Sequence, residues 1–295
     1  MANLKEIKLK IGSVSNTQKT TKAMKLVSSA KLTRTRQLSE QARAYASKIN
    51  DVLSEIAHEV SKVQDGEMTD RAFIPNDAPK TVDIVFVTAD KGLCGGFNMA
   101  TIKTVNRLMK EYQSKGATVR LRVAGRKGMD YFTFQKVALA QKVNDLSSAP
   151  DYDRACEFIE EAVKDFNNGV TDKVVLVYNG FLNMLTQEIR VRDLLPITLE
   201  DAPKKEKESS MLDIEPDDDG EVLKELTGKY IDFNMYYSLI DSLAAEHSAR
   251  MQAMEAATKN AKERVDTLTI EYNKARQAAI TTELIEIISG VESLK

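Results

Sequence analysis

The chain has 295 residues, enough for two domains, and its 42 Lys and Arg against 44 Asp and Glu leave a net charge of −2. Its two cysteines, Cys94 and Cys156, are too far apart in sequence for a short metal or redox motif, and they indicate reduced thiols in a cytosolic compartment. No apolar run approaches the roughly eighteen residues that a membrane span needs, so we expect any membrane association to come through partners.

The small net charge hides an uneven distribution of charge along the chain. Nine basic residues stand between Met1 and Arg36 against Glu6 alone, whereas acidic residues prevail from Glu200 to Glu221. Both clusters are explained either by solvated surface or by a basic helix that faces an acidic partner. Nucleic acid is one such partner, but the basic stretch has no aromatic residue for base stacking before Tyr45, so we expect no nucleic acid.

The first element in chain order is a long helix from Asn3 to about His58. This stretch lacks proline, its only glycine is Gly12, and its apolar residues recur at alternating intervals of four and three, which is typical of a coiled-coil seam. Serine and threonine interrupt the seam in its middle. The apolar positions are Leu4, Ile7, Ile11 and Val14, and then Ala42, Ala46, Ile49, Leu53, Ile56 and Val60.

Residues 61–216 show a different pattern, in which short apolar runs alternate with amphipathic stretches. The order strand, helix, strand, helix, strand predicts a Rossmann-like open α/β sheet with right-handed crossovers. A polar, acidic stretch at 200–220 is expected to be a linker. The predicted strands are 82–88, 118–124 and 173–178, and the predicted helices are 97–115, a short one around Met129 and Tyr131, and one capped by Asp151 that runs to Asn168.

A second long helix is predicted from Glu221 to Lys295, where there is no proline and only two glycines. At about 1.5 Å per residue it would be about 100 Å long, too long for an ordinary core helix. Its seam positions are Leu226, Tyr230, Phe233, Tyr237, Ile240, Ala244, His247, Met251, Met254, Thr258, Ala261, Val265, Leu268, Tyr272, Ala275, Ala279, Thr282 and Glu286.

The two long helices are expected to pair in an antiparallel coiled coil. The first helix would run toward the globular body and the second away from it, if both extend from the same body. Position numbers of facing residues should then add to roughly 279, so Leu4 should face a residue near Ala275. The residues beyond that point have nothing in this chain to pack on. Their apolar positions, Ile280, Leu284, Ile285, Ile287, Ile288, Val291 and Leu294, change phase there and cover more than one face, so we expect a partner to enclose them.

The best candidate for a catalytic site is the loop from Asp90 to Asn98, between a predicted strand and a helix. Its glycines could bring backbone amides to a phosphate, but their spacing fits neither the dinucleotide nor the P-loop fingerprint, which favours a structural turn. Cys94 has only His58 and His247 as possible bases, and both lie on the predicted long helices. We therefore predict no catalytic residue, no cofactor-binding residue and no metal ligand.

Four segments resemble the gamma subunit of the F-type ATP synthase, in the right order and over essentially the whole chain. They are Ser13–Lys31 (SVSNTQKTTKAMKLVSSAK), Thr88–Asn98 (TADKGLCGGFN), Glu246–Ala261 (EHSARMQAMEAATKNA) and Tyr272–Glu286 (YNKARQAAITTELIE), of which the last is the most specific.

The resemblance implies a non-catalytic subunit, the central-stalk rotor of a proton-translocating F-type ATP synthase at the cytoplasmic face of the bacterial inner membrane. Segments 1–60 and 217–295 would form the coiled coil inside a hexamer of alpha and beta subunits, with its tip in an apolar sleeve. Segment 61–216 would be the base, which sits with the epsilon subunit on the ring of c subunits.

The resemblance also implies contact residues. We expect contacts with the beta subunit from Arg276 and Gln277, and from Met24 and Lys25 opposite them on the other helix. The residues expected in the sleeve are Ile280, Leu284, Ile287, Ile288 and Val291, and those expected to contact epsilon or the ring are Gly92, Cys94 and Asn98. Two other functions stay open at this point, a nucleotide-binding enzyme with coiled-coil extensions and a coiled-coil tether or chaperone.

Overall fold

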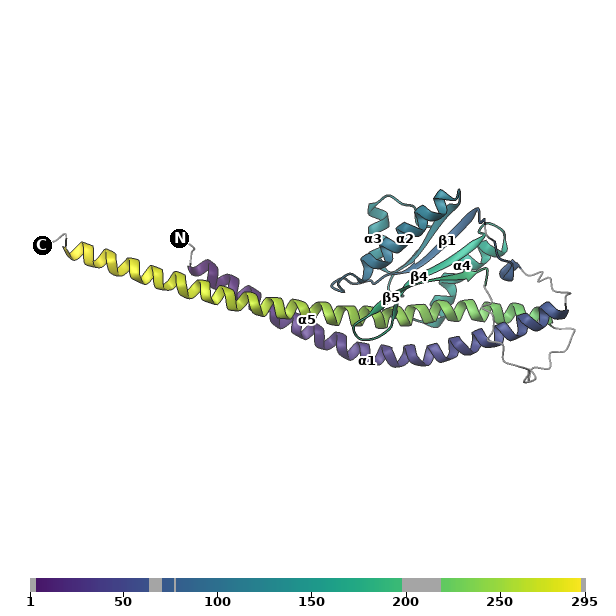
Figure 1. The fold of residues 1–295 in the computed structure, drawn as a ribbon, viewed down its shortest axis with the longest axis horizontal. Coiled ribbons are helices and arrows are strands. Elements are labelled where there is room, and N and C mark those ends of the chain that lie inside the picture. Colours follow the sequence, from purple (N-terminus) through teal and green to yellow (C-terminus); the bar gives the residue numbers. More distant parts are fainter. Residues whose placement is uncertain (1–3, 64–70, 77, 198–218, 293–295) are drawn as a thin grey trace. The chain divides into compact units, whose positions relative to one another are not determined.

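The computed structural model describes residues 4–63, 71–76, 78–197 and 219–292 (Figure 1). The first and last elements are the two predicted long helices, α1 at Leu4–Val63 and α5 at Asp219–Glu292. The described residues form two compact units. One contains residues up to Ser29 together with those from Arg250 onward, and the other contains Ala30–Ala249.

The larger unit contains a five-stranded sheet with the strand order β3-β2-β1-β4-β5. Strands β1 to β4 are parallel, and β5 runs antiparallel to β4 at one edge. The open α/β sheet between two long helices in the sequence is confirmed, but β3 and β5 were not predicted. The strands are β1 (Thr81–Val87), β2 (Thr118–Ala124), β3 (Gln141–Val143), β4 (Lys173–Phe181) and β5 (Gln187–Leu195).

Alternation along the strands gives the sheet two apolar faces. Ile84 and Phe86 of β1 pack with α2 (Phe97–Ser114) and α3 (Arg126–Phe134). Val85 and Val87 point the other way and pack with α4 (Tyr152–Asn167) and α5. Figure 1 shows α2 and α3 on one side of the sheet and α4 with α5 on the other. A short 3-10 helix, η1 (Arg71–Phe73), adds Phe73 to the second face.

The part of α5 that belongs to the larger unit is buried on more sides than its sequence predicted. Ile231, Met235 and Leu239 pack in the sheet core, while Tyr237 and Ile240 pack against Ala42 of α1. Every residue from 237 to 249 is buried. The helix therefore has two buried faces here, whereas a single seam was expected.

The seam between α1 and α5 continues through the positions where serine and threonine interrupt its apolar pattern. Ser28 and Ser39 of α1 are each 3% exposed, at the same heptad spacing as the apolar seam residues. Facing positions add to 279 for Thr21 and Thr258 and to 280 for Ser39 and Asp241, which confirms the predicted antiparallel register.

Helix α1 ends at Val63 and α5 begins at Asp219. The acidic linker 200–220 lies almost wholly outside the described residues, as do the side chains of Ile56 and Val60. The division into segments 1–60, 61–216 and 217–295 stays a prediction.

Candidate partner-binding surfaces

The C-terminal end of α5 exposes an apolar surface. All residues from 280 to 291 are exposed, whereas the seam positions Tyr272, Ala275 and Ala279 just before them are half-buried. Six large apolar side chains in this stretch, which we call the apolar tip, are between 49% and 62% exposed. The apolar tip consists of Ile280, Leu284, Ile285, Ile287, Ile288 and Val291.

The apolar tip covers one broad arc of the helix surface. At 100° per residue its six side chains span about 160°, while Glu283 and Glu286 fall outside that arc. The hydroxyls of Thr281 and Thr282 donate to the carbonyls of Gln277 and Ala278. These local bonds leave the threonines little demand for a polar partner, so the tip suits an apolar surface better than a polar one.

The four residues expected to contact the beta subunit do not form one site. Lys25 donates to Glu255 of α5 at 2.7 Å, and Met24 beside it is half-buried. Arg276 and Gln277 are exposed and lie roughly 30 Å further along α5 at 1.5 Å per residue. The expectation that Met24 and Lys25 lie opposite them is therefore wrong, because the antiparallel register places Lys25 against Glu255.

The loop from Asp90 to Asn98 is fixed by its own side chains. The Asn98 side chain accepts a hydrogen bond from the backbone amide of Ala89 at 2.8 Å and donates to Cys94 Sγ at 3.2 Å. Cys94 is 2% exposed, while Gly92 and Asn98 are half-buried. The loop presents the large apolar side chain of Leu93 to solvent, beside the exposed residues Lys91, Gly95 and Gly96; Leu93 is 62% exposed and has a φ of +63°.

Asp90 occupies the place that an anion would take at the N-terminus of α3. One carboxylate oxygen accepts from the amides of Arg126 and Asp145, and the other accepts from the hydroxyl of Ser147 and the amide of Ser148. A helix N-terminus after a parallel strand is a common phosphate site, but here the chain's own carboxylate binds its amide. The loop is therefore built as a structural turn, in agreement with its glycine spacing.

Gly125, just before α3, is required by the close approach of two strand ends. Its φ is +112°, and a Cβ atom there would lie 1.9 Å from the carbonyl oxygen of Thr88. No other residue fits without moving the backbone.

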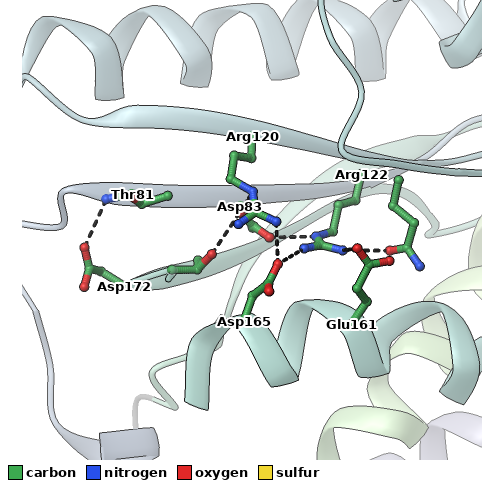
Figure 2. A network of polar contacts seen from close by, with 9 residues as sticks. Thr81, Asp83, Arg120, Arg122, Glu161, Asp165 and Asp172 are labelled. Carbon is green, nitrogen blue, oxygen red and sulfur yellow. Dashed lines mark hydrogen bonds and ion pairs between the residues drawn. The ribbon is translucent and has the colours of Figure 1, made fainter. Parts of the chain in front are cut away.

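A buried network of ion pairs joins the sheet to α4, and Figure 2 shows its members. Arg122 is fully buried; its Nε donates to Asp83 at 2.6 Å and its Nη2 to Asp165 of α4 at 2.5 Å. Arg120 also pairs with Asp83 and Asp165, and Glu161 lies at the exposed rim. We did not predict this network, although charged residues inside the apolar runs VDIVFV and VRLRVA were a signal of it.

No group of three or more His, Cys, Asp or Glu side chains among the described residues is placed to hold a metal ion. No helix in the described part of the chain is long and apolar enough to cross a membrane. Both cysteines are free thiols, and Cys94 Sγ accepts a hydrogen bond from the side chain of Asn98.

Comparisons with known proteins all point to the ATP synthase. Residues 3–294 match the family model described as ATP synthase. The ATP synthase gamma chain of Aliarcobacter butzleri is 78% identical, with all of both chains covered. A chain in the central stalk and c-ring structure of the Tetrahymena thermophila mitochondrial ATP synthase is 25% identical with a TM-score of 0.58, covering 80% of this chain and 98% of that one. A chain in the rotor of the Euglena gracilis enzyme shares the fold, with 16% identity, a TM-score of 0.61 and coverage of 94% and 98%.

Proposed function

The chain belongs to the ATP synthase gamma chain family and is a central-stalk subunit; on that premise we propose that it transmits rotation from a membrane ring of c subunits to catalytic beta subunits. The chain itself is non-catalytic. The observation that carries the proposal is the apolar tip of α5, which continues beyond the end of the helix pair.

The apolar tip has the chemistry of a rotating bearing. Its large side chains are exposed and offer dispersion contacts that depend little on angle, while the neighbouring hydroxyls of Thr281 and Thr282 are bonded within the helix. Buried ion pairs would act differently, because breaking one by removing its partner costs about 3–5 kcal/mol. We propose that Ile280, Leu284, Ile287, Ile288 and Val291 turn inside an apolar sleeve made by alpha and beta subunits.

The paired part of α1 and α5 supplies the shaft. Two helices joined by a continuous seam resist twisting better than one, and the pair in the smaller unit is fixed by Thr21 with Thr258 and by Lys25 with Glu255. Exposed lysines on α1, such as Lys19 and Lys22, can attract acidic segments of each beta subunit in turn. Differential contact of this kind shifts a subunit between two conformations.

The proposed polar contacts with the beta subunit fall at two levels along the shaft. Arg276 and Gln277 are exposed on α5, so their side chains are accessible to a partner. Met24 and the Lys25–Glu255 pair lie at another level and would meet a different part of the beta subunit. The two pairs are thus separate contacts.

The base is proposed to contact the epsilon subunit or the c ring near Gly92, Cys94 and Asn98. Because Cys94 is buried and Asn98 is bonded within the loop, the direct contact would come from Leu93, which these residues hold outward. A non-glycine residue with positive φ is uncommon and is found at functional sites more often than elsewhere. Through these partners the chain would sit at the cytoplasmic face of the bacterial inner membrane.

A reconstitution tests the proposed function. The purified chain is mixed with alpha and beta subunits, and ATPase activity and stoichiometry are measured. We expect one copy of the chain per three beta subunits and ATP hydrolysis that rises on assembly. An unchanged rate together with no stable complex would exclude the rotor function, and ATP hydrolysis by the chain alone would favour an enzyme.

A further inference from the structure

We propose that a groove between α1 and the β4–β5 hairpin binds a protein segment of another synthase subunit, one that presents a carboxylate beside an aliphatic side chain. This inference rests on the proposed function, because it takes the partner from the same complex. The groove lies in the larger unit and has a volume of about 490 Å³. Its lining residues are Arg36, Ser39, Glu40 and Arg43 of α1 and Phe181–Leu185 of the hairpin.

The hairpin wall of the groove is apolar and exposed. Leu182 is 57%, Met184 48% and Leu185 78% exposed, three large apolar side chains within four residues. Isolated exposed apolar residues need no explanation, but a contiguous group beside a groove marks an interaction surface. This wall would receive an aliphatic side chain of the partner.

The hairpin wall is held in place before any partner binds. The Asn183 side chain accepts hydrogen bonds from the amides of Leu185 and Thr186 at 2.8 and 2.9 Å. Ser248 of α5 donates to the carbonyl of Met184 at 2.8 Å and accepts from Gln187 at 3.1 Å. A rigid wall loses little conformational entropy on binding, which favours affinity.

Two residues that line the groove, Ser39 and Arg43, belong to a polar cluster with an excess of positive charge. Asp241 of α5 is fully buried and accepts from Ser39 at 3.0 Å and from Arg190 of β5 at 2.8 Å. Arg43 donates through Nε to the hydroxyl of Tyr237 at 3.2 Å. The cluster therefore contains two arginines and a single carboxylate, and that carboxylate is paired with Arg190.

Arg43 is the group that would bind the partner's carboxylate. Arg36 is already paired with Glu40 at 2.8 Å, whereas Arg43 has no carboxylate within ion-pair distance among the described residues. With Nε bonded to Tyr237, the Nη groups of Arg43 remain to donate to an anion. A guanidinium binds a carboxylate with two parallel hydrogen bonds, so the geometry selects an acidic partner next to the apolar wall.

Photo-crosslinking in the complete synthase tests this inference. Leu185 is replaced by the photoreactive residue p-benzoylphenylalanine, the assembled complex is irradiated, and crosslinked peptides are identified by mass spectrometry. We expect a crosslink to one segment of another subunit that contains Asp or Glu next to an aliphatic residue. Phe134, which is 83% exposed at the end of α3, provides the matched position, and its probe should not capture that segment.

The role of Arg43 is tested in the same complex. Arg43→Gln should lower the crosslinking yield from Leu185 by at least about tenfold, the loss expected when a charge-assisted hydrogen bond is removed. Arg34→Gln removes an exposed charge of α1 outside the groove and should leave the yield unchanged. Equal yields in the two variants would overturn the proposal.

The remaining outcomes separate this inference from the proposed function. A crosslink to a second copy of this chain, to a segment without a carboxylate, or to nothing in a complex that still hydrolyses ATP overturns the groove proposal alone. Failure of the unsubstituted chain to assemble with alpha and beta subunits overturns both.

Discussion

Single residues with buried charge stabilise the larger unit. Arg122 is completely enclosed, and its guanidinium contacts Asp83 in the neighbouring strand and Asp165 in α4. The register of the parallel strands places Asp83 beside Arg120, so the sheet itself aligns the charges. Each charged residue of the network stabilises the fold only while its partners are present, because a buried charge without a partner is also without water.

The first prediction concerns that network. Arg122→Met should lower the free energy of unfolding by about 3–5 kcal/mol, because it leaves Asp83 buried without its closest cation. Urea denaturation of the isolated chain measures the loss. Glu161→Gln removes a charge that also pairs with Arg122 but is 53% exposed, and it should cost less than about 1 kcal/mol. A similar loss in both variants would contradict the argument from burial.

The second prediction concerns Asp232 of α5, which lies against Cys156 and Tyr152 of α4. Burial raises the pKa of Asp232, the hydrogen bond from Cys156 lowers it in part, and Glu160 raises it further. Because the pKa in the folded state exceeds the unfolded value, ionisation costs stability as the pH rises through the folded pKa. Asp232→Asn should therefore be more stable than the parent at pH 7.

The pH dependence of this difference provides the check. The melting temperatures of the two proteins should converge below about pH 3, where the carboxyl is mostly protonated in both states, and diverge toward pH 7. Burial raises the pKa of Tyr152 to about 12 and also raises the pKa of Cys156, so neither group titrates in this window. A difference that is constant between about pH 3 and pH 7 would show that Asp232 is not the cause.

The burial of α5 changes along its length. Before Ala279, seam positions of α5 are half-buried or buried against α1; after it, every side chain up to Val291 is exposed. Helix propensity alone does not distinguish these stretches, and the difference arises because α1 begins at Leu4. The end of α5 is therefore free to serve a partner without loss of internal packing.

The third prediction follows from this exposure. Truncation after Ala279 should leave the melting temperature of the isolated chain unchanged, because the removed side chains that the structure describes are exposed. In the assembled synthase the same truncation should lower coupled ATP synthesis several-fold, since the proposed bearing is removed. As a control, Glu283→Gln with Glu286→Gln changes the opposite arc and should leave synthesis unaffected. Full synthesis by the truncated rotor would show that the apolar tip is not a bearing.

At the scale of the whole molecule, the chain consists of two units with different kinds of core. The larger unit has a sheet with apolar clusters on both faces. The smaller unit relies on one helix seam, whose buried positions include Thr21 and Ser28 as well as Leu268. A seam that contains polar residues buries less apolar surface, so the smaller unit should open at lower free energy.

The fourth prediction tests that independence. Leu268→Ala should destabilise the seam by roughly 2 kcal/mol, which is a factor of about 30 in amide protection. Hydrogen exchange should accelerate in residues 4–29 and 250–279 and stay unchanged in β1 and β4. Ile270→Ala, at a position 57% exposed, is the control and should change neither. Equal acceleration in both units would mean that they open together.

Sequence by itself determined the long helices, their register, the free end of α5 and the three strands that are rich in apolar residues. These features depend on local periodicity and on counting along the chain, which require no knowledge of packing. The match of Thr21 with Thr258 shows how far counting alone can reach.

Only the tertiary structure decided the features that depend on contacts between distant segments. Strand β5 lies at the sheet edge and alternates charged and apolar residues, and β3 has only three residues, so neither shows the apolar run of a buried strand. The second buried face of α5 exists because the sheet packs on it. The structure likewise shows that Asp90 accepts from backbone amides and that Lys25 pairs with Glu255, far from Arg276. Burial and ion pairing depend on the packing of the whole chain. The role of the charged residues inside the strands is therefore visible only in the fold, where Asp83, Arg122 and Asp165 contact one another.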